Sequence, residues 1–413
     1  MILRTFGPFA LLCLLASACP AQISPFPSND WFSLNDAGEK AYERRQYAAA
    51  ERFLQAALEQ ARQFGPDDPR LATTLNDLGL LYRAEGKFKD AESCYRRSLA
   101  IREKKLGPSD TLVAASLNNL AGLCAAQQRY AEADRHYHRA LAIREKALGP
   151  NHPQVAVILN NLASMYSAQE KFTRAEPLLK RALDIRERTL SPDDPQIANA
   201  LNNLASVYTS QGKFDQAEPL YRRAIGIDEK IQGPEQTALT FDLSNLAAMY
   251  VRQAKYALAE PLYQRALDIR DKTLGPEHPL TGVAVVNLAG LYDAQSRYAE
   301  AEPLYRRAVS IFDQPAGGDP GQLASVLQSL AEMYAAENKF ADAQDSYARL
   351  LALQEKIHGS QSMALVFTLE HDAMVLRKLG RDTQAADCES RARAIRAAQP
   401  KPKSPAAKPS SPS

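Results

Sequence analysis

The sequence predicts an all-α solenoid built from helix-turn-helix repeats, and two observations support this. A short pattern, written LNNLASMY in its clearest copy, recurs with a constant step of 42 residues. A period in this range is typical of solenoids, in which each unit packs only on its neighbours. The central leucine of the pattern is Leu78, Leu120, Leu162, Leu204, Leu246, Leu288 and Leu330, and a strictly repeated alanine is Ala91, Ala133, Ala175, Ala217, Ala259, Ala301, Ala343 and Ala385.

Each repeat has the hydrophobic spacing of two helices. In the clearest copy, Leu159, Leu162, Ala163 and Tyr166 are apolar at i, i+3, i+4 and i+7, which puts them on one face of a first helix. A polar turn at 167–171 separates this helix from a second apolar stripe. We expect the solenoid over residues 34–399, as eight to nine units that begin near residues 34, 71, 112, 154, 196, 238, 280, 321 and 362.

The loops between repeats carry signals for the end of one helix and the start of the next. Gly-Pro or Ser-Pro ends a helix, and Asp-Pro begins the following one, because Asp is a good N-cap and Pro suits the first helical position. His152 and His278 occupy the Asp position, so we expect them to cap helices rather than bind metal. Thr111 replaces the proline, which predicts a less sharp helix start. The Asp-Pro starts are Asp68-Pro69, Asp194-Pro195 and Asp319-Pro320.

The first residues are expected to be an export signal. Arg4 is the only basic residue before a short apolar stretch, and small residues follow this stretch at 16–18. The apolar stretch is too short to span a bilayer as a mature helix. We therefore expect a signal peptide over residues 1–18 and an exported protein in the cell envelope or periplasm, or otherwise a secreted one.

The segment LASAC, which ends at Cys19, resembles a bacterial lipobox. This resemblance implies that Cys19 is lipidated and attaches the protein to a membrane. Ordinary cleavage after Ala18 or Ala21 is the alternative. Residues 19–33 read as a linker, and the Pro-, Lys- and Ser-rich residues 400–413 are expected to be a disordered tail.

Composition argues against several function classes. The chain has 50 Lys+Arg and 48 Asp+Glu residues, a formal net charge of +2, whereas a nucleic-acid scaffold needs a basic stripe. We therefore expect no nucleic-acid partner. The sequence contains no GxSxG, HExxH, P-loop or GxGxxG motif, so we expect no enzyme and no cofactor. His and Cys form no group with metal-ligand spacing, and Cys124 reads as a small buried hydrophobe, so we expect no metal.

The helix pairs resemble tetratricopeptide repeats, whose ordinary length is 34 residues. The 42-residue version, with LNNLA and AEPLYRRAL, is similar to the kinesin light chain type. The resemblance implies a right-handed superhelix that binds extended peptide segments in a concave groove lined by the first helices. Kinesin cargo transport is not implied, because the export signal does not suit it. The matching packing residues are Leu162, Ala163, Tyr166, Phe172, Ala175, Leu179 and Ala182.

By this resemblance, the first asparagine of each LNNL copy faces the groove. Asparagine offers a donor and an acceptor to a peptide backbone, and the small residue four positions later leaves room for a ligand chain. The second asparagine is expected to form a hydrogen bond between helices. A solvated inner face is the alternative for the first asparagine. The candidate peptide-binding residues are Asn76, Asn118, Asn160, Asn202, Ser164 and Ser206.

These features together predict a non-catalytic scaffold that binds a protein or peptide partner of unknown identity. An envelope assembly or secretion accessory with a chaperone-like role is the alternative. We expect that Asn160→Ala combined with Asn202→Ala weakens partner binding with little loss of stability. Arginine pairs such as Arg222-Arg223 and Arg306-Arg307 on the second helices are expected to form a solvated face, and a patch for anionic surfaces is the alternative.

Overall fold

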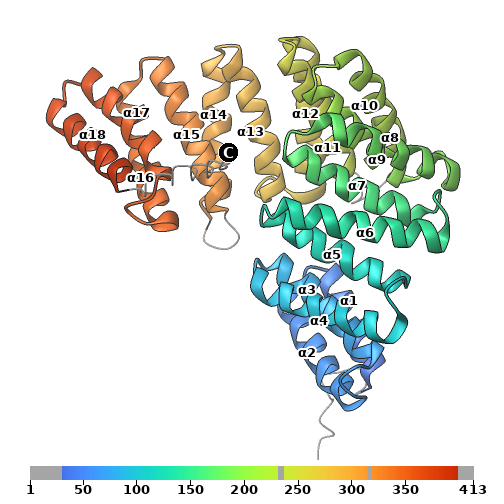
Figure 1. Cartoon of the computed structure of the whole chain (residues 1–413). Coiled ribbons are helices and arrows are strands. Elements are labelled where there is room, and N and C mark those ends of the chain that lie inside the picture. The colour runs from blue at the N-terminus through green and yellow to red at the C-terminus, as the bar shows by residue number, and fades with distance from the viewer. Residues whose placement is uncertain (1–29, 231–236, 315–318, 399–413) are drawn as a thin grey trace, which may run out of the picture. The chain divides into compact units, whose positions relative to one another are not determined.

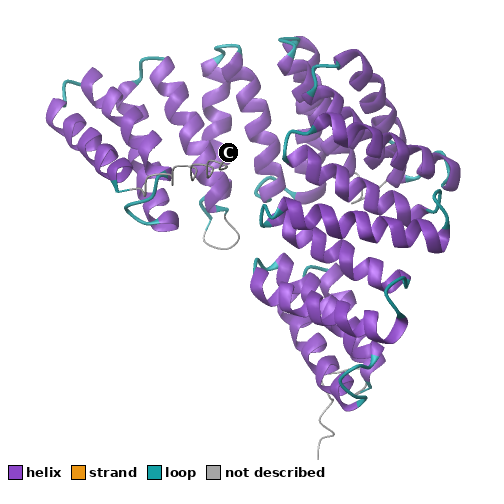
Figure 2. Cartoon of the chain, in the orientation of Figure 1, coloured by secondary structure: helices purple, strands orange, loops and turns teal. Residues whose placement is uncertain are grey.

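The structure is a computed structural model that describes residues 30–230, 237–314 and 319–398. These residues form eighteen α-helices joined by turns, and they contain no strand (Figures 1 and 2). The predicted all-α repeat architecture is therefore confirmed. The chain divides into two compact units, and the division falls within α7, between Met165 and Tyr166.

Unit 1 is built from helix pairs in which α1 packs on α2, α3 on α4, and α5 on α6. Buried leucines and alanines fill the space within and between these pairs, as where Leu54 and Ala50 pack with Leu78 and Leu81. The helices are α1 (Trp31–Glu43), α2 (Tyr47–Gln63), α3 (Pro69–Ala84), α4 (Phe88–Leu106), α5 (Thr111–Ala126), α6 (Tyr130–Leu148) and α7 (Pro153–Ala168), which contains the division.

Unit 2 continues the same pairing, with α9 on α10, α11 on α12, α13 on α14, α15 on α16, and α17 on α18. Its helices are α8 (Phe172–Thr189), α9 (Pro195–Ser210), α10 (Phe214–Asp228), α11 (Thr237–Arg252), α12 (Tyr256–Leu274), α13 (Pro279–Ala294), α14 (Tyr298–Phe312), α15 (Pro320–Ala336), α16 (Phe340–His358), α17 (Ala364–Lys378) and α18 (Asp382–Ala397). The odd-numbered helices are the first helices of the repeats, and the even-numbered helices are the second.

The first helix begins inside the segment that was expected to be a linker. Asp30 accepts a hydrogen bond from the backbone N–H of Ser33 at 3.0 Å, and this cap starts α1 at Trp31. The expected linker over 19–33 is therefore wrong for its last residues, because the Asp30 carboxylate caps a helix there. The predicted signal peptide, Cys19 and the predicted tail lie outside the described residues.

The helix starts follow the loop chemistry that the sequence predicts. The carboxylates of Asp68, Asp194 and Asp319 cap α3, α9 and α15, each with proline at the start of the helix. His278 caps α13, where its Nδ1 accepts from the Leu280 N–H at 3.1 Å, so the expected capping role is confirmed there. The less sharp start expected at Thr111 is wrong, since the carboxylate of Asp110 caps α5 without help from a proline.

The second helices α4, α6, α12 and α16 end at glycines, and the second helices pack through the alanine column. Gly107 and Gly149 follow α4 and α6 with φ of +86° and +91°, a conformation that side chains with a Cβ rarely adopt. Every alanine of the strict column is fully buried, as expected for close helix approach. In the described part of the chain, no helix is long and apolar enough to cross a membrane.

Candidate functional site

The predicted peptide-binding residues lie on consecutive first helices. The four asparagines are half-buried, whereas Ser164 and Ser206 are exposed. Half-buried amides need hydrogen-bond partners, so their contacts decide what they can offer to a ligand. Asn76 lies on α3, Asn118 on α5, Asn160 and Ser164 on α7, and Asn202 and Ser206 on α9.

In unit 1, the second asparagine of one repeat donates to the first asparagine of the repeat before it. Asn119 Nδ2 donates to Asn76 Oδ1 at 2.9 Å, and Asn161 Nδ2 donates to Asn118 Oδ1 at 3.0 Å. We call this series of side-chain amides the amide ladder. It confirms the predicted interhelical role of the second asparagine, and it shows that the acceptor is the residue predicted to face a ligand.

The amide ladder of unit 1 ends on a carboxylate. Asn76 Nδ2 donates to Asp77 Oδ1 at 3.3 Å, and Asn35 Nδ2 donates to Asp77 Oδ2 at 2.9 Å. Asn35 Oδ1 in turn accepts from the hydroxyl of Thr74 at 2.9 Å. Burial raises the pKa of Asp77 above its usual range, while the amides of Asn35 and Asn76 act in the opposite direction. The ladder thus joins α1, α3, α5 and α7 through side chains.

A bond of the same kind in unit 2 leads to a buried acid. Asn245 Nδ2 donates to Asn202 Oδ1 at 3.0 Å, and Asn202 Nδ2 donates to Asp242 Oδ1 at 2.6 Å. Asp242 Oδ2 and Asp228 Oδ1 are buried without a hydrogen-bond partner. Burial, and then the negative charge of Asp228, raises the pKa of Asp242 to about 8. Asp242 is therefore mostly protonated near neutral pH.

A hollow of about 240 Å³ lies between α5 and α7 within unit 1. Asn118 and Asn119 line it from α5, Gln154 and Val157 line it from α7, and Arg144 reaches it from α6. Val157 is 44% exposed, which gives the hollow an apolar rim next to the amides. The hollow is where Asn118, a predicted site residue, borders open space.

The small residues four positions after the first asparagine have structural roles of their own. The Ser164 hydroxyl donates to the backbone carbonyl of Asn160 at 2.9 Å, so its proton is already used within α7. Gly122 occupies the same column in α5, and a Cβ there would come within 2.9 Å of Arg83 Nη1. Contacts within the fold therefore already favour small residues at these two positions.

Arginines on the second helices are partly exposed to solvent, and several of them bridge successive repeats. Arg307 Nη2 lies 2.6 Å from Asp271 Oδ1 on the preceding second helix, and Arg223 pairs with Glu187 in the same way. Exposed ion pairs of this kind contribute about 0–1 kcal/mol each. Because these guanidiniums already have carboxylate partners, they offer little unpaired charge to an anionic surface.

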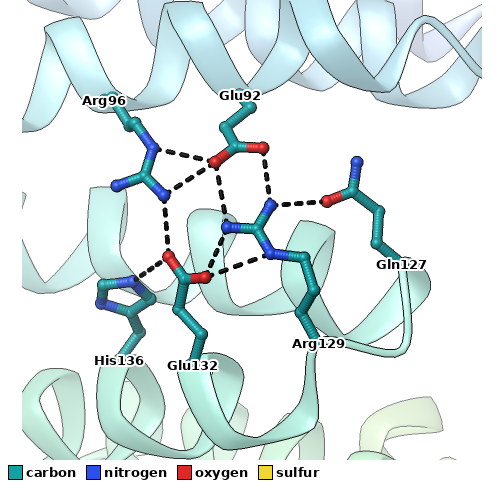
Figure 3. Close-up of polar contacts among 6 residues, drawn as sticks. All are labelled: Glu92, Arg96, Gln127, Arg129, Glu132 and His136. Atoms are coloured by element: carbon teal, nitrogen blue, oxygen red, sulfur yellow. Dashed lines mark hydrogen bonds and ion pairs between the residues drawn. The ribbon is translucent and has the colours of Figure 1, made fainter. Parts of the chain in front are cut away.

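A network of charged side chains joins α4 to the start of α6 (Figure 3). Arg129 donates to Glu92 Oε2 at 2.6 Å and also bonds to Glu132, while Arg96 Nη2 donates to Glu132 Oε1 at 2.7 Å. The hydrogen bonds from Arg129, and then from Arg96, lower the pKa of Glu132 to about 2. The two guanidiniums and the two carboxylates compensate one another's charge.

Three side chains of types that bind metal ions in proteins lie close together beside this network. Cys124 Sγ, one carboxylate oxygen of Glu132 and one ring nitrogen of His136 all lie within 4.8 Å of one another. Cys124 is fully buried on α5, whereas Glu132 and His136 lie one turn apart on α6. His136 Nε2 is 3.6 Å from Glu132 Oε1, too far for a hydrogen bond, and it is buried without another partner.

The burial of this group decides the protonation of its members. Burial lowers the pKa of His136, which favours the neutral imidazole, and raises the pKa of Cys124 to about 11, which keeps the thiol protonated. Linear spacing does not reveal this group, because its members lie on two different helices. The sequence could have singled out Cys124 and His136, because they stand where other repeats have Tyr and Leu.

The chain is similar to several solved structures. BtubC (BKLC) from P. vanneervenii is 25% identical, with 62% of this chain and 99% of that chain covered and a TM-score of 0.46. The apo form of the quorum sensor NprR from B. thuringiensis is 15% identical, with coverage of 88% and 98% and a TM-score of 0.57. Aspartyl phosphate phosphatase F from Bacillus subtilis is 12% identical, with coverage of 89% and 94% and a TM-score of 0.52.

The family comparison agrees with the repeat architecture. No curated protein matches the sequence. The tetratricopeptide repeat model, in contrast, matches residues 33–104, 112–188, 158–230 and 237–314, which together make up more than half of the chain. The amide ladder and the predicted peptide-binding residues lie within these ranges, whereas α15 to α18 lie beyond them. The chain therefore belongs to the tetratricopeptide repeat family.

Proposed function

We propose that this chain is a non-catalytic scaffold that holds an extended peptide segment of a partner protein against its first helices. The observation that carries the proposal is the hollow between α5 and α7, where the amides of Asn118 and Asn119 stand beside the exposed Val157. Peptide sites combine apolar contact with a few polar groups that fix orientation. This hollow offers both within unit 1.

The amide ladder supports the proposal through the hydrogen-bonding capacity that it leaves unused. Asn118 Oδ1 accepts one bond from Asn161, and an amide oxygen has a second lone pair. An amide nitrogen likewise carries two protons, so Asn118 can still donate to a peptide carbonyl. Because the ladder fixes the amide orientation beforehand, ordering these side chains adds little to the entropic cost of binding.

The ladder also changes what we expect from the asparagine variants. Asn202 accepts from Asn245 and donates to Asp242, so Asn202→Ala removes two hydrogen bonds that belong to the fold. A loss of binding in this variant would therefore be mixed with a loss of stability. Substitutions at the exposed rim of the hollow separate the two effects. We keep Asn76, Asn118, Asn160, Asn202, Ser164 and Ser206 as the proposed peptide-binding set.

Selection from a random peptide library displayed on phage, with the full-length chain as bait, tests this proposal. The tightest peptide is then measured by fluorescence anisotropy against the wild type and Val157→Glu. We expect Val157→Glu to weaken binding at least about tenfold, which corresponds to about 1.4 kcal/mol. Leu106→Glu is the matched control, because Leu106 is 38% exposed at the end of α4 and does not line the hollow.

Two outcomes would overturn the proposal. Failure to select any peptide would argue against peptide binding as the function. Equal binding by the wild type and Val157→Glu, with Leu106→Glu also unchanged, would mean that the peptide binds elsewhere.

We also propose that the protein is exported, with Cys19 as its lipidated N-terminus and attachment point to a membrane. The support is the apolar leader and the lipobox-like LASAC. The intact mass of the protein, purified from membranes of its native host, tests this proposal. A mature chain that begins at an acylated Cys19 is expected, and an unmodified N-terminus at Gln22 would contradict it.

A further inference from the structure

We propose that Cys124, Glu132 and His136 form a binding site for a divalent transition-metal ion of the Zn²⁺ class, between α5 and α6. One ligand atom from each residue lies within 4.8 Å of the other two. The site is separate from the hollow, because none of these three residues lines the hollow. The proposal is therefore independent of the proposed peptide binding.

The donor set indicates the class of ion. Thiolate sulfur, imidazole nitrogen and carboxylate oxygen are the ligands of Zn²⁺, whereas Mg²⁺ and Ca²⁺ prefer oxygen alone. Three protein ligands leave a fourth position for water. The Glu132 and His136 side chains are 22% and 20% exposed, so an ion can enter, and a water molecule can bind, from the solvent side.

The geometry needs only a small adjustment of side chains. Tetrahedral bonds of about 2.0–2.3 Å place ligand atoms about 3.3–3.8 Å apart. The present upper limit of 4.8 Å thus means that ligand atoms approach one another by about 1.5 Å at most when they bind the ion. Glu132 and His136 are spaced i and i+4 on α6, which already puts them on one face of the helix.

Cys124 and His136 both differ from the residues that other repeats have at the same positions. Cys124 stands where six other repeats have tyrosine, and in unit 2 Tyr292 and Tyr334 use that hydroxyl to donate to Glu260 and Glu302 at 3.1 Å each. Packing therefore does not require a cysteine. His136 stands where four repeats have leucine, and its Nε2 is buried without a hydrogen-bond partner. A bound ion would satisfy this nitrogen, and a ligand role accounts for both exceptions.

The charged side chains around Glu132 orient its carboxylate. Their charges balance, so they do not repel a metal ion. Arg96 and Arg129 hold Glu132 in place, and Glu92 balances the additional guanidinium (Figure 3). Hydrogen-bond partners of a ligand side chain fix its orientation in metal sites. When the ion binds, the Cys124 S–H bond breaks, its proton leaves to solvent and a metal–sulfur bond forms. The thiolate then offsets one of the two positive charges.

The test uses the full-length chain, stripped of metal and titrated with Co²⁺ as a spectroscopic probe. We expect one equivalent to bind with a sulfur-to-cobalt charge-transfer band, and we expect Zn²⁺ to displace it. His136→Leu and Cys124→Tyr restore the residues of other repeats, so both should fold. Each is expected to lose the charge-transfer band and to weaken Co²⁺ binding about 100-fold or more.

Two matched controls keep the same residue types outside the site. His138→Leu alters the neighbouring histidine of α6, which does not share a face with His136, and Cys94→Ser alters a cysteine of α4. Both should retain the band, and circular dichroism checks that all variants fold. A wild type without the band, or a band that survives in Cys124→Tyr, would overturn the proposal.

Discussion

The first helices of unit 1 and unit 2 repeat the same packing residues but satisfy their polar side chains differently. In unit 1, Asn119 and Asn161 donate to the asparagines of the preceding repeat, so the polar bonds cross from helix to helix. In unit 2, Ser244 donates to the carbonyl of Thr240 in its own helix, and Gln328 donates to Glu332 in its own helix.

This difference between the units indicates which contacts of a repeat survive substitution. A packing alanine such as Ala91 or Ala217 meets its neighbours at every repeat, and both are fully buried. An amide-ladder bond, in contrast, needs an asparagine in each of two repeats, so one substitution breaks it. Unit 2 has the bond from Asn245 to Asn202, and the column of first asparagines then changes to Ser244, Val286 and Gln328.

The largest expected effect comes from the buried acid at the end of the unit 2 bond. The pKa of Asp242 rises from 3.8 to about 8, so the stability that its protonated form contributes is complete below pH 3.8 and is lost as the pH rises through 8. Asp242→Ala removes this loss, and alanine fits because Ala200 and Ala284 occupy the same column. At pH 8.5 we expect the variant to be more stable, by on the order of 5 kcal/mol at most.

Urea unfolding at pH 5 and pH 8.5 measures this effect. The advantage of Asp242→Ala over the wild type should shrink towards pH 5, where the wild-type carboxyl is largely protonated. Asp268→Ala is the control, because Asp268 is exposed on α12 and should leave the pH dependence unchanged. Identical pH dependence in Asp242→Ala and the wild type would show that the acid does not titrate as its burial implies.

Overpacking of the alanine column should affect the two units alike. Ala91→Leu in unit 1 and Ala217→Leu in unit 2 each force a larger side chain into a fully buried position. We expect each to cost about 1–3 kcal/mol. Thermal unfolding checks this, with the exposed Ala126 changed to leucine as a control within about 0.5 kcal/mol of the wild type. An unchanged melting curve for either buried variant would contradict the equivalence of the packing columns.

Breaking a bond of the amide ladder in unit 1 should cost more stability than changing Gln328, which stands in the same column of unit 2. Asn118→Ala leaves Asn161 Nδ2 without its acceptor, and we expect a cost of about 1–2 kcal/mol. Gln328→Ala changes the same column in unit 2, where the partner Glu332 lies on the same helix, and should cost less than about 0.5 kcal/mol. Equal costs in chemical denaturation would mean that the amide ladder does not couple repeats.

Much of the fold was predictable because local rules repeat in the sequence. The spacing of Leu159, Leu162 and Tyr166 specifies a helix face, and the chemistry of Asp68-Pro69 specifies where α3 starts. The start of α1 was harder to predict because Trp31 follows Asp30 where proline follows Asp68, and because Asp30 precedes Asp68 by 38 residues instead of 42.

The candidate sites were predictable only in part. The sequence identified the asparagine columns and the interhelical role of Asn119, but not that its acceptor would be Asn76. Which amide pairs with which depends on how successive first helices lie side by side, and one sequence does not state that register. The double role of Asn202 is visible only once Asn245 and Asp242 are seen beside it.

The sequence by itself determined the repeat period, the helix pairs and the packing columns, because these follow from short-range spacing that is written many times in the chain. The tertiary structure alone decided which polar side chains meet. Cys124 on α5 and His136 on α6 come together only through helix packing, and so do Arg129 and Glu92. Packing requires only apolar side chains of suitable size. Hydrogen bonds and metal ligation require particular atoms within about 3–4 Å of one another.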